Sequence, residues 1–124
     1  MLKNILILAV IFTLIDAGFL YLMKDNFNKI IRKIQGSDLK LNMIYTILCY
    51  VFLIAIIYYF LIYKKATLLD AFLLGLFTYG IFETTNMAIF KDWDPKIGFI
   101  DIIWGGILFS STFYIYNIVQ NNLK

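Results

Sequence analysis

Four long apolar segments, separated by short polar connections, constrain the fold of this chain more than any other feature of its sequence. They cover about residues 5–23, 43–63, 68–90 and 97–119. At about 1.5 Å of rise per residue, a helix of that length crosses a bilayer hydrocarbon core of about 30 Å. The chain is 62% hydrophobic, which is more apolar surface than a soluble domain of 124 residues can bury. The sequence therefore predicts one all-α domain, residues 1–124, that forms an integral membrane four-helix bundle.

The longest connection, residues 24–40, mixes apolar and basic side chains at helical spacing. Its apolar positions are Phe27, Ile30, Ile31 and Ile34, with Lys29, Arg32 and Lys33 between them. This pattern predicts a short amphipathic helix that lies in the membrane interface after the first span and ends at Gly36. The alternative is that the helix of the first span continues out of the membrane through these residues.

The distribution of Lys and Arg predicts the orientation in the membrane. Four spans place both termini on one face. That face carries Lys3, Lys64, Lys65 and Lys124, and the opposite face carries Lys24, Lys29, Arg32, Lys33, Lys40, Lys91 and Lys96. The positive-inside rule then places the two longer loops in the cytoplasm and the termini outside.

Several function classes lack their sequence signatures. The chain has no His and a single Cys, and its net charge of +3 comes from Lys and Arg at the segment ends, which is typical of membrane flanks and not of nucleic-acid binding. We find no nucleophile elbow, phosphate-binding loop, paired-cysteine metal motif or dinucleotide fingerprint. The sequence therefore predicts no catalytic residue, metal or cofactor, and favours a protein that is not an enzyme.

Five polar side chains interrupt the apolar segments at similar depth. Asp16 lies in the first segment, Glu83 and Asn86 in the third, and Asp101 and Trp104 in the fourth. Counted along the helices from the face that carries the longer loops, they lie roughly 6 to 10 Å deep. Polar groups are costly at that depth in lipid and often mark function. The sequence therefore predicts an intramembrane polar site built by these three spans.

The charge state of the three acids is the central question about this site. An isolated carboxylate in a span costs about 2.5–3.5 kcal/mol, and no Lys or Arg lies within the four segments. A proton, a cation, a Lys from a span end or a wet cavity must offset that charge, and each makes the site responsive to pH or to ions. The alternative is a purely structural role, in which these groups only form hydrogen bonds to neighbouring helices, at about 0.6 kcal/mol each.

Other residues have structural interpretations. Small side chains at Ala71, Gly75 and Gly105 favour close contact between helices. Trp93, in the short charged loop between the third and fourth segments, is predicted to anchor at the membrane interface. The second segment carries no charge and is predicted to be scaffold, with Cys49 as packing.

Three blocks of the sequence resemble the small four-span membrane proteins grouped as domain of unknown function 2177. The blocks are LIDAGFL, FETTNMAIFKDW and IDIIWGG, and they cover about a third of the chain. The resemblance implies importance for Asp16, Glu83, Thr85, Asn86, Trp93, Asp101, Trp104 and Gly105. The chain departs from the family pattern where Glu83 replaces the usual Asp, Phe19 stands where Trp is common, and Pro95 is displaced by one position. The resemblance implies a membrane bundle and supplies no reaction.

Three functional hypotheses follow. The first is a proton- or cation-responsive site that serves transport or permeation, in a homo-oligomer, because four thin helices leave little room for a pore. The second is a pocket that binds or modifies a lipid or amphiphile, with an acid as proton donor. The third is a structural or accessory subunit whose acids only lock helix packing. The lipid bilayer is the one partner common to all three.

Overall fold

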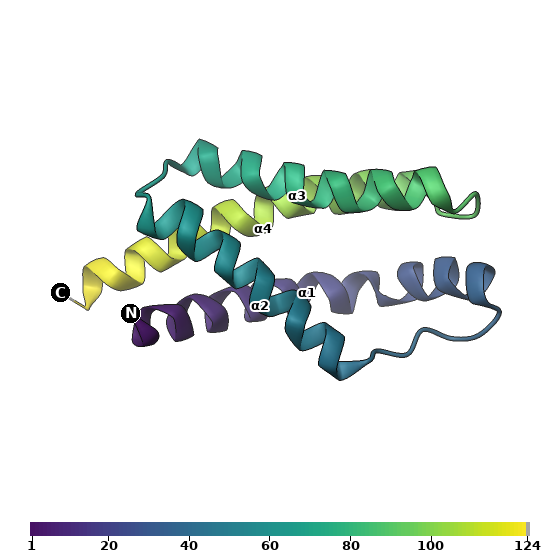
Figure 1. Ribbon diagram of the computed structural model, residues 1–124, viewed down its shortest axis with the longest axis horizontal. Coiled ribbons are helices and arrows are strands. Elements are labelled where there is room, and N and C mark those ends of the chain that lie inside the picture. The colour runs from purple at the N-terminus through teal and green to yellow at the C-terminus, as the bar shows by residue number, and fades with distance from the viewer. Residues whose placement is uncertain (124) are drawn as a thin grey trace.

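The computed structural model describes residues 1–123, which form four helices and a short π-helical continuation. The elements are α1 (Leu2–Gln35), α2 (Met43–Ile57), η1 (Tyr58–Tyr63), α3 (Leu68–Ile89) and α4 (Pro95–Asn122). Four helical stretches, with η1 counted as part of the second, are long and apolar enough to cross a membrane. The predicted all-α, four-span membrane architecture is thus confirmed. Both termini lie at the same end of the bundle, α3 and α4 run antiparallel side by side, and α2 crosses α1 obliquely (Figure 1).

Helix α1 does not end where the first apolar segment ends. It is continuous over 34 residues, about 51 Å at 1.5 Å per residue, which exceeds the roughly 30 Å of a hydrocarbon core. A separate amphipathic interfacial helix after the first span is therefore not confirmed. The chain follows the other predicted course, because residues 24–35 contain no Gly or Pro to interrupt the helix. The helix ends at Gly36, whose φ of +78° favours glycine.

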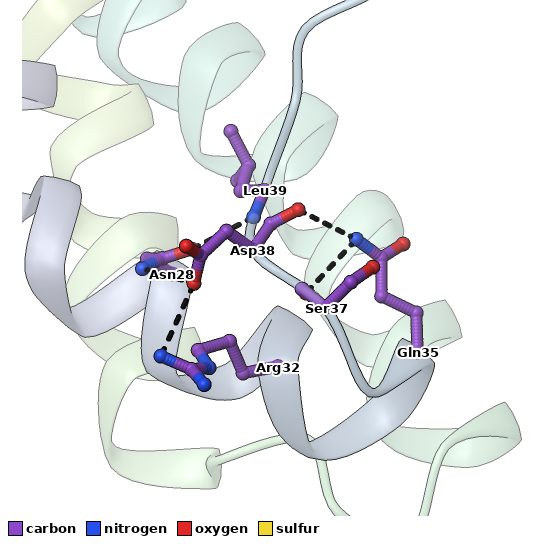
Figure 2. A network of polar contacts seen from close by, with 6 residues as sticks. All are labelled: Asn28, Arg32, Gln35, Ser37, Asp38 and Leu39. Atoms are coloured by element: carbon purple, nitrogen blue, oxygen red, sulfur yellow. Dashed lines mark hydrogen bonds and ion pairs between the residues drawn. The ribbon is translucent and has the colours of Figure 1, made fainter.

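The connection after α1 folds back on the last turns of that helix (Figure 2). Asn28 accepts the backbone N–H of Leu39 at 2.7 Å, and Arg32 pairs with Asp38 at 3.3 Å. Gln35 donates to the backbone carbonyls of Ser37 and Asp38. These contacts hold the connection against the part of α1 that exceeds the span length.

The other helices begin at side chains that accept backbone N–H groups. Asn42 accepts from the first turn of α2, and Asp94 accepts from Lys96 at the start of α4, with Pro95 at the first helical position. Thr67 and Asp70 form a reciprocal capping box at the start of α3. Each cap satisfies N–H groups that would otherwise be unpaired at a helix end.

Glycines set the distance between α3 and α4. A Cβ at Gly75 would overlap the backbone carbonyl of Gly105, and a Cβ at Gly105 would overlap Tyr79. Ala71, one turn before Gly75, is fully buried. This close approach of the two backbones brings the polar side chains of α3 and α4 to one another.

Candidate functional site

Asp16 is the point where three helices meet through polar side chains. It lies on α1 and is 4% exposed. Its Oδ2 accepts the hydroxyl of Tyr50 from α2 at 2.6 Å, and its Oδ1 accepts the indole N–H of Trp104 from α4 at 3.1 Å. Hydrogen bonds to a charged group are each worth about 1.5–3 kcal/mol in soluble proteins. Asp16 therefore ties α1 to α2 and to α4.

The ring of Trp104 is held in place by Phe19 of α1. The two rings are stacked, with centroids 4.4 Å apart and planes within 4°. Phe19 lies three residues after Asp16, so both side chains project from the same face of α1. The contact orients the indole N–H toward the carboxylate of Asp16.

Glu83 occupies the second part of the site and is fully buried. Its Oε2 accepts the indole N–H of Trp93 at 2.7 Å. Helix α4 passes close to the carboxyl of Glu83. A Cβ at Gly98 of α4 would lie 3.3 Å from the same oxygen. A larger side chain at Gly98 would therefore press on the carboxyl of Glu83.

Trp93 is buried among side chains of the protein, and its predicted place at the membrane interface stays a prediction. Only 8% of the residue is exposed, and its ring packs against Phe82 and Phe90 of the preceding segment. Its N–H group donates to Glu83 and is therefore not available to headgroups or water. The physical reason is that a buried carboxyl needs a donor, and the loop after α3 supplies it.

Asp101 lies beside Glu83, within hydrogen-bonding reach of its carboxyl, and within electrostatic range of Asp16. Asp101 is 6% exposed. One oxygen of Glu83, Oε1, is buried without a hydrogen-bond partner, as is the amide nitrogen of Asn86 one turn further along α3. Within residues 1–123 the one ion pair joins Arg32 to Asp38 at the protein surface, so none of the three buried acids pairs with a basic side chain.

The structure brings most of the predicted site residues together. Asp16 contacts Trp104, and Glu83 adjoins Asp101. Asn86 is partly buried near Glu83 without a hydrogen bond to it. Thr85 is exposed. It precedes Asn86 by one residue, and side chains of adjacent residues on a helix point about 100° apart.

Sequence reasoning missed Tyr50. The second segment was predicted to be scaffold because it carries no charge, yet Tyr50 supplies the shorter of the two hydrogen bonds to Asp16. One signal was available in the sequence. Tyr50 lies well inside the apolar segment 43–63, whereas interfacial tyrosines cluster near segment ends.

The arrangement comprises two adjoining carboxyl clusters. In each, an acid accepts an indole N–H: Asp16 from Trp104, and Glu83 from Trp93. Asp101 adjoins the second cluster, beside Glu83. In residues 1–123 no group of three or more His, Cys, Asp or Glu side chains is placed to hold a metal ion. Carboxyl groups can accept hydrogen bonds and can bind and release protons.

The fold and these buried acids define a multi-pass integral membrane protein with carboxyl groups inside its helix bundle, which sits in a lipid bilayer. A family model described as predicted membrane protein (DUF2177) matches residues 1–116. The chain belongs to this family. Comparisons with curated proteins and with solved structures found no match.

Proposed function

We propose that the protein binds and exchanges a proton at the Glu83–Asp101 carboxyl pair inside the membrane, and that this exchange serves proton-responsive transport or permeation. The observation that carries the proposal is the environment of Glu83. Its carboxyl is fully buried beside that of Asp101, and its Oε1 has no donor. Two adjoining carboxylates without a cation repel each other, and sharing one proton relieves that repulsion. The same proton supplies a donor within the pair.

The groups around the pair offer steps for a proton. The hydroxyl of Tyr50 from α2 donates to Asp16 at 2.6 Å. Carboxyl and phenol groups can each accept and release a proton along a hydrogen-bonded chain. A proton is favoured over a metal cation as the bound species, because the three acids do not converge on one point in residues 1–123.

Proton flux into liposomes tests this proposal. The purified protein is reconstituted with a trapped pH-sensitive dye, and a potassium diffusion potential is applied with valinomycin. We expect the parent to move protons faster than empty liposomes and Glu83→Gln to abolish that difference. Asp92→Asn is the matched control, since Asp92 is an exposed acid in the neighbouring loop.

Two outcomes would contradict the proposal in different ways. A parent flux equal to that of empty liposomes removes transport and permeation. A Glu83→Gln flux equal to that of the parent removes the carboxyl pair from the path. In the first case, a pH-independent stability of the parent would additionally favour a structural role for the acids.

A further inference from the structure

A groove lies between α1 and the α2–η1 span, apart from the carboxyl pair. Helix α2 crosses α1 obliquely (Figure 1). Side chains of the two helices line a space of about 750 Å³. Its walls are almost wholly apolar and include Ile5, Ala9, Ile47, Val51, Ile54 and Ala55. Val51 and Ala55 are exposed, so the groove is open to the surroundings of the bundle and not an enclosed cavity.

Two of the five hydroxyl groups along this groove are hydrogen-bonded within the protein. The Thr46 hydroxyl donates to the Asn42 carbonyl of its own helix at 2.9 Å. The Tyr50 hydroxyl donates to Asp16. Because the wall is almost wholly apolar, it suits a hydrocarbon chain, whose transfer from water is favourable and whose contacts are made by dispersion.

The length of the groove matches one leaflet of a bilayer. It follows α1 from Met1 to Thr13, which is about 18 Å at 1.5 Å per residue. A hydrocarbon core of about 30 Å gives roughly 15 Å to the acyl chains of each leaflet. One acyl chain that enters at the terminal end of the bundle would thus fill the groove along its length.

Two lysines, Lys64 and Lys3, lie at that same end of the groove. Tyr59 lines the groove, and the Nζ of Lys64 lies 5.2 Å from the centroid of its ring. Lys3 follows in the first turn of α1. Where a leaflet contains anionic lipids, a basic side chain at its surface attracts their headgroups by about 1 kcal/mol.

We propose that the groove binds one acyl chain of an anionic phospholipid from the leaflet at the terminal face, with the lipid phosphate beside Lys64. The proposal rests on the apolar groove, its length and the charge at its mouth, and it does not depend on proton exchange at Glu83. Lipid binding and proton flux are therefore separate measurements, and either can fail without the other.

Native mass spectrometry tests the lipid site. The protein is incorporated into nanodiscs that contain equal amounts of phosphatidylglycerol and phosphatidylcholine with identical chains, then released in detergent. We expect one retained lipid per chain, with phosphatidylglycerol preferred. Ala55→Phe places a ring in the groove and should lower retention about tenfold, the change that roughly 1.4 kcal/mol of lost binding produces. Lys64→Gln should remove the preference for phosphatidylglycerol while the chain still binds a lipid.

Matched controls separate loss of the site from loss of the fold. Ala88→Phe adds the same ring to the exposed surface of α3, and Lys91→Gln removes a positive charge from the other face of the membrane. Both should retain phosphatidylglycerol as the parent does, and all variants should elute as the parent does in size exclusion. Equal retention by Ala55→Phe and the parent would overturn the proposal. So would equal retention of the two lipids by the parent, or a lipid-free dimer, which would indicate a second copy in the groove.

Discussion

Replacement of Glu83 by Gln removes one carboxyl group of the buried pair while it preserves the shape of the side chain. The amide oxygen can still accept the indole N–H of Trp93, which lies 2.7 Å from Oε2 in the parent. The amide NH₂ group can donate toward the adjoining carboxyl of Asp101. The variant therefore keeps both contacts without a titrating group at this position.

The expected change in the free energy of unfolding with pH follows from the number of protons that the folded and unfolded chains bind. Carboxyls of the unfolded chain ionise near pH 4, so above that pH the unfolded chain holds no proton at these two residues. While the folded pair holds one, the free energy of unfolding falls by about 1.4 kcal/mol for each unit of rising pH. Across two pH units the parent should lose roughly 3 kcal/mol, and the loss ends where the folded pair also releases its proton. Glu83→Gln should lack this slope and should be the more stable protein at the alkaline end.

Unfolding by sodium dodecyl sulfate in mixed micelles, measured by circular dichroism, gives this free energy over a range from about pH 5 to 9, where solvated carboxyls are already ionised. Asp92→Asn serves as the control, because Asp92 is exposed in the adjacent loop and its replacement should leave the slope of the parent unchanged. A parent whose unfolding free energy does not change with pH would refute the shared proton. A Glu83→Gln variant that retains the parent's slope would assign the titration to another group.

Four further outcomes are expected. Gly75→Ala should lower the unfolding free energy by about 1–3 kcal/mol, because the added Cβ meets a carbonyl of α4. Gly80→Ala is the control and should be neutral or stabilising, because its added Cβ would lie 3.9 Å from the nearest atom of another side chain. Equal effects of the two substitutions would contradict the close helix contact. Tyr50→Phe should cost about 1–2 kcal/mol in the same unfolding assay, because the α1 carboxylate loses one of two donors, and an unchanged stability would show that this hydrogen bond adds nothing. Cys49→Ala should change stability by less than about 0.5 kcal/mol, because the thiol is exposed, and a large loss would indicate that it packs against a partner. In that background, a cysteine at Asn122 should react with a membrane-impermeant maleimide in intact cells, whereas reaction only after permeabilisation would reverse the predicted orientation.

The four spans could be predicted because they depend on local quantities, and the depth of the acids in the membrane stays a prediction made in the same way. Hydropathy over about 20 residues decides whether a segment enters the membrane, and a rise of about 1.5 Å per residue converts a position into a depth. Asp16, Glu83 and Asp101 are accordingly buried in the bundle, as their cost in lipid requires. The predicted orientation in the membrane stays a prediction.

The partners of those acids depended on the tertiary structure. Tyr50 and Trp104 lie 34 and 88 residues from Asp16 in the chain, and their contact requires a particular rotation and crossing angle of each helix. Spacing along one helix defines which side chains share a face, and it does not define which other helix that face meets. The glycine contact between α3 and α4 and the oblique crossing of α2 supply that information.

Trp93 and the end of α1 show the same limit. The amphipathic pattern of residues 24–35 suits an interfacial helix and a continued α1 equally, and only the contacts of the following connection with Asn28 and Arg32 show which course the chain takes. The sequence likewise does not show that the indole N–H of Trp93 meets the buried carboxyl of Glu83, because that contact depends on how the loop packs against α3. Composition and periodicity thus determined which residues enter the membrane, and packing between distant segments decided which of them meet, because a hydrogen bond forms only between groups that the whole fold brings to about 3 Å.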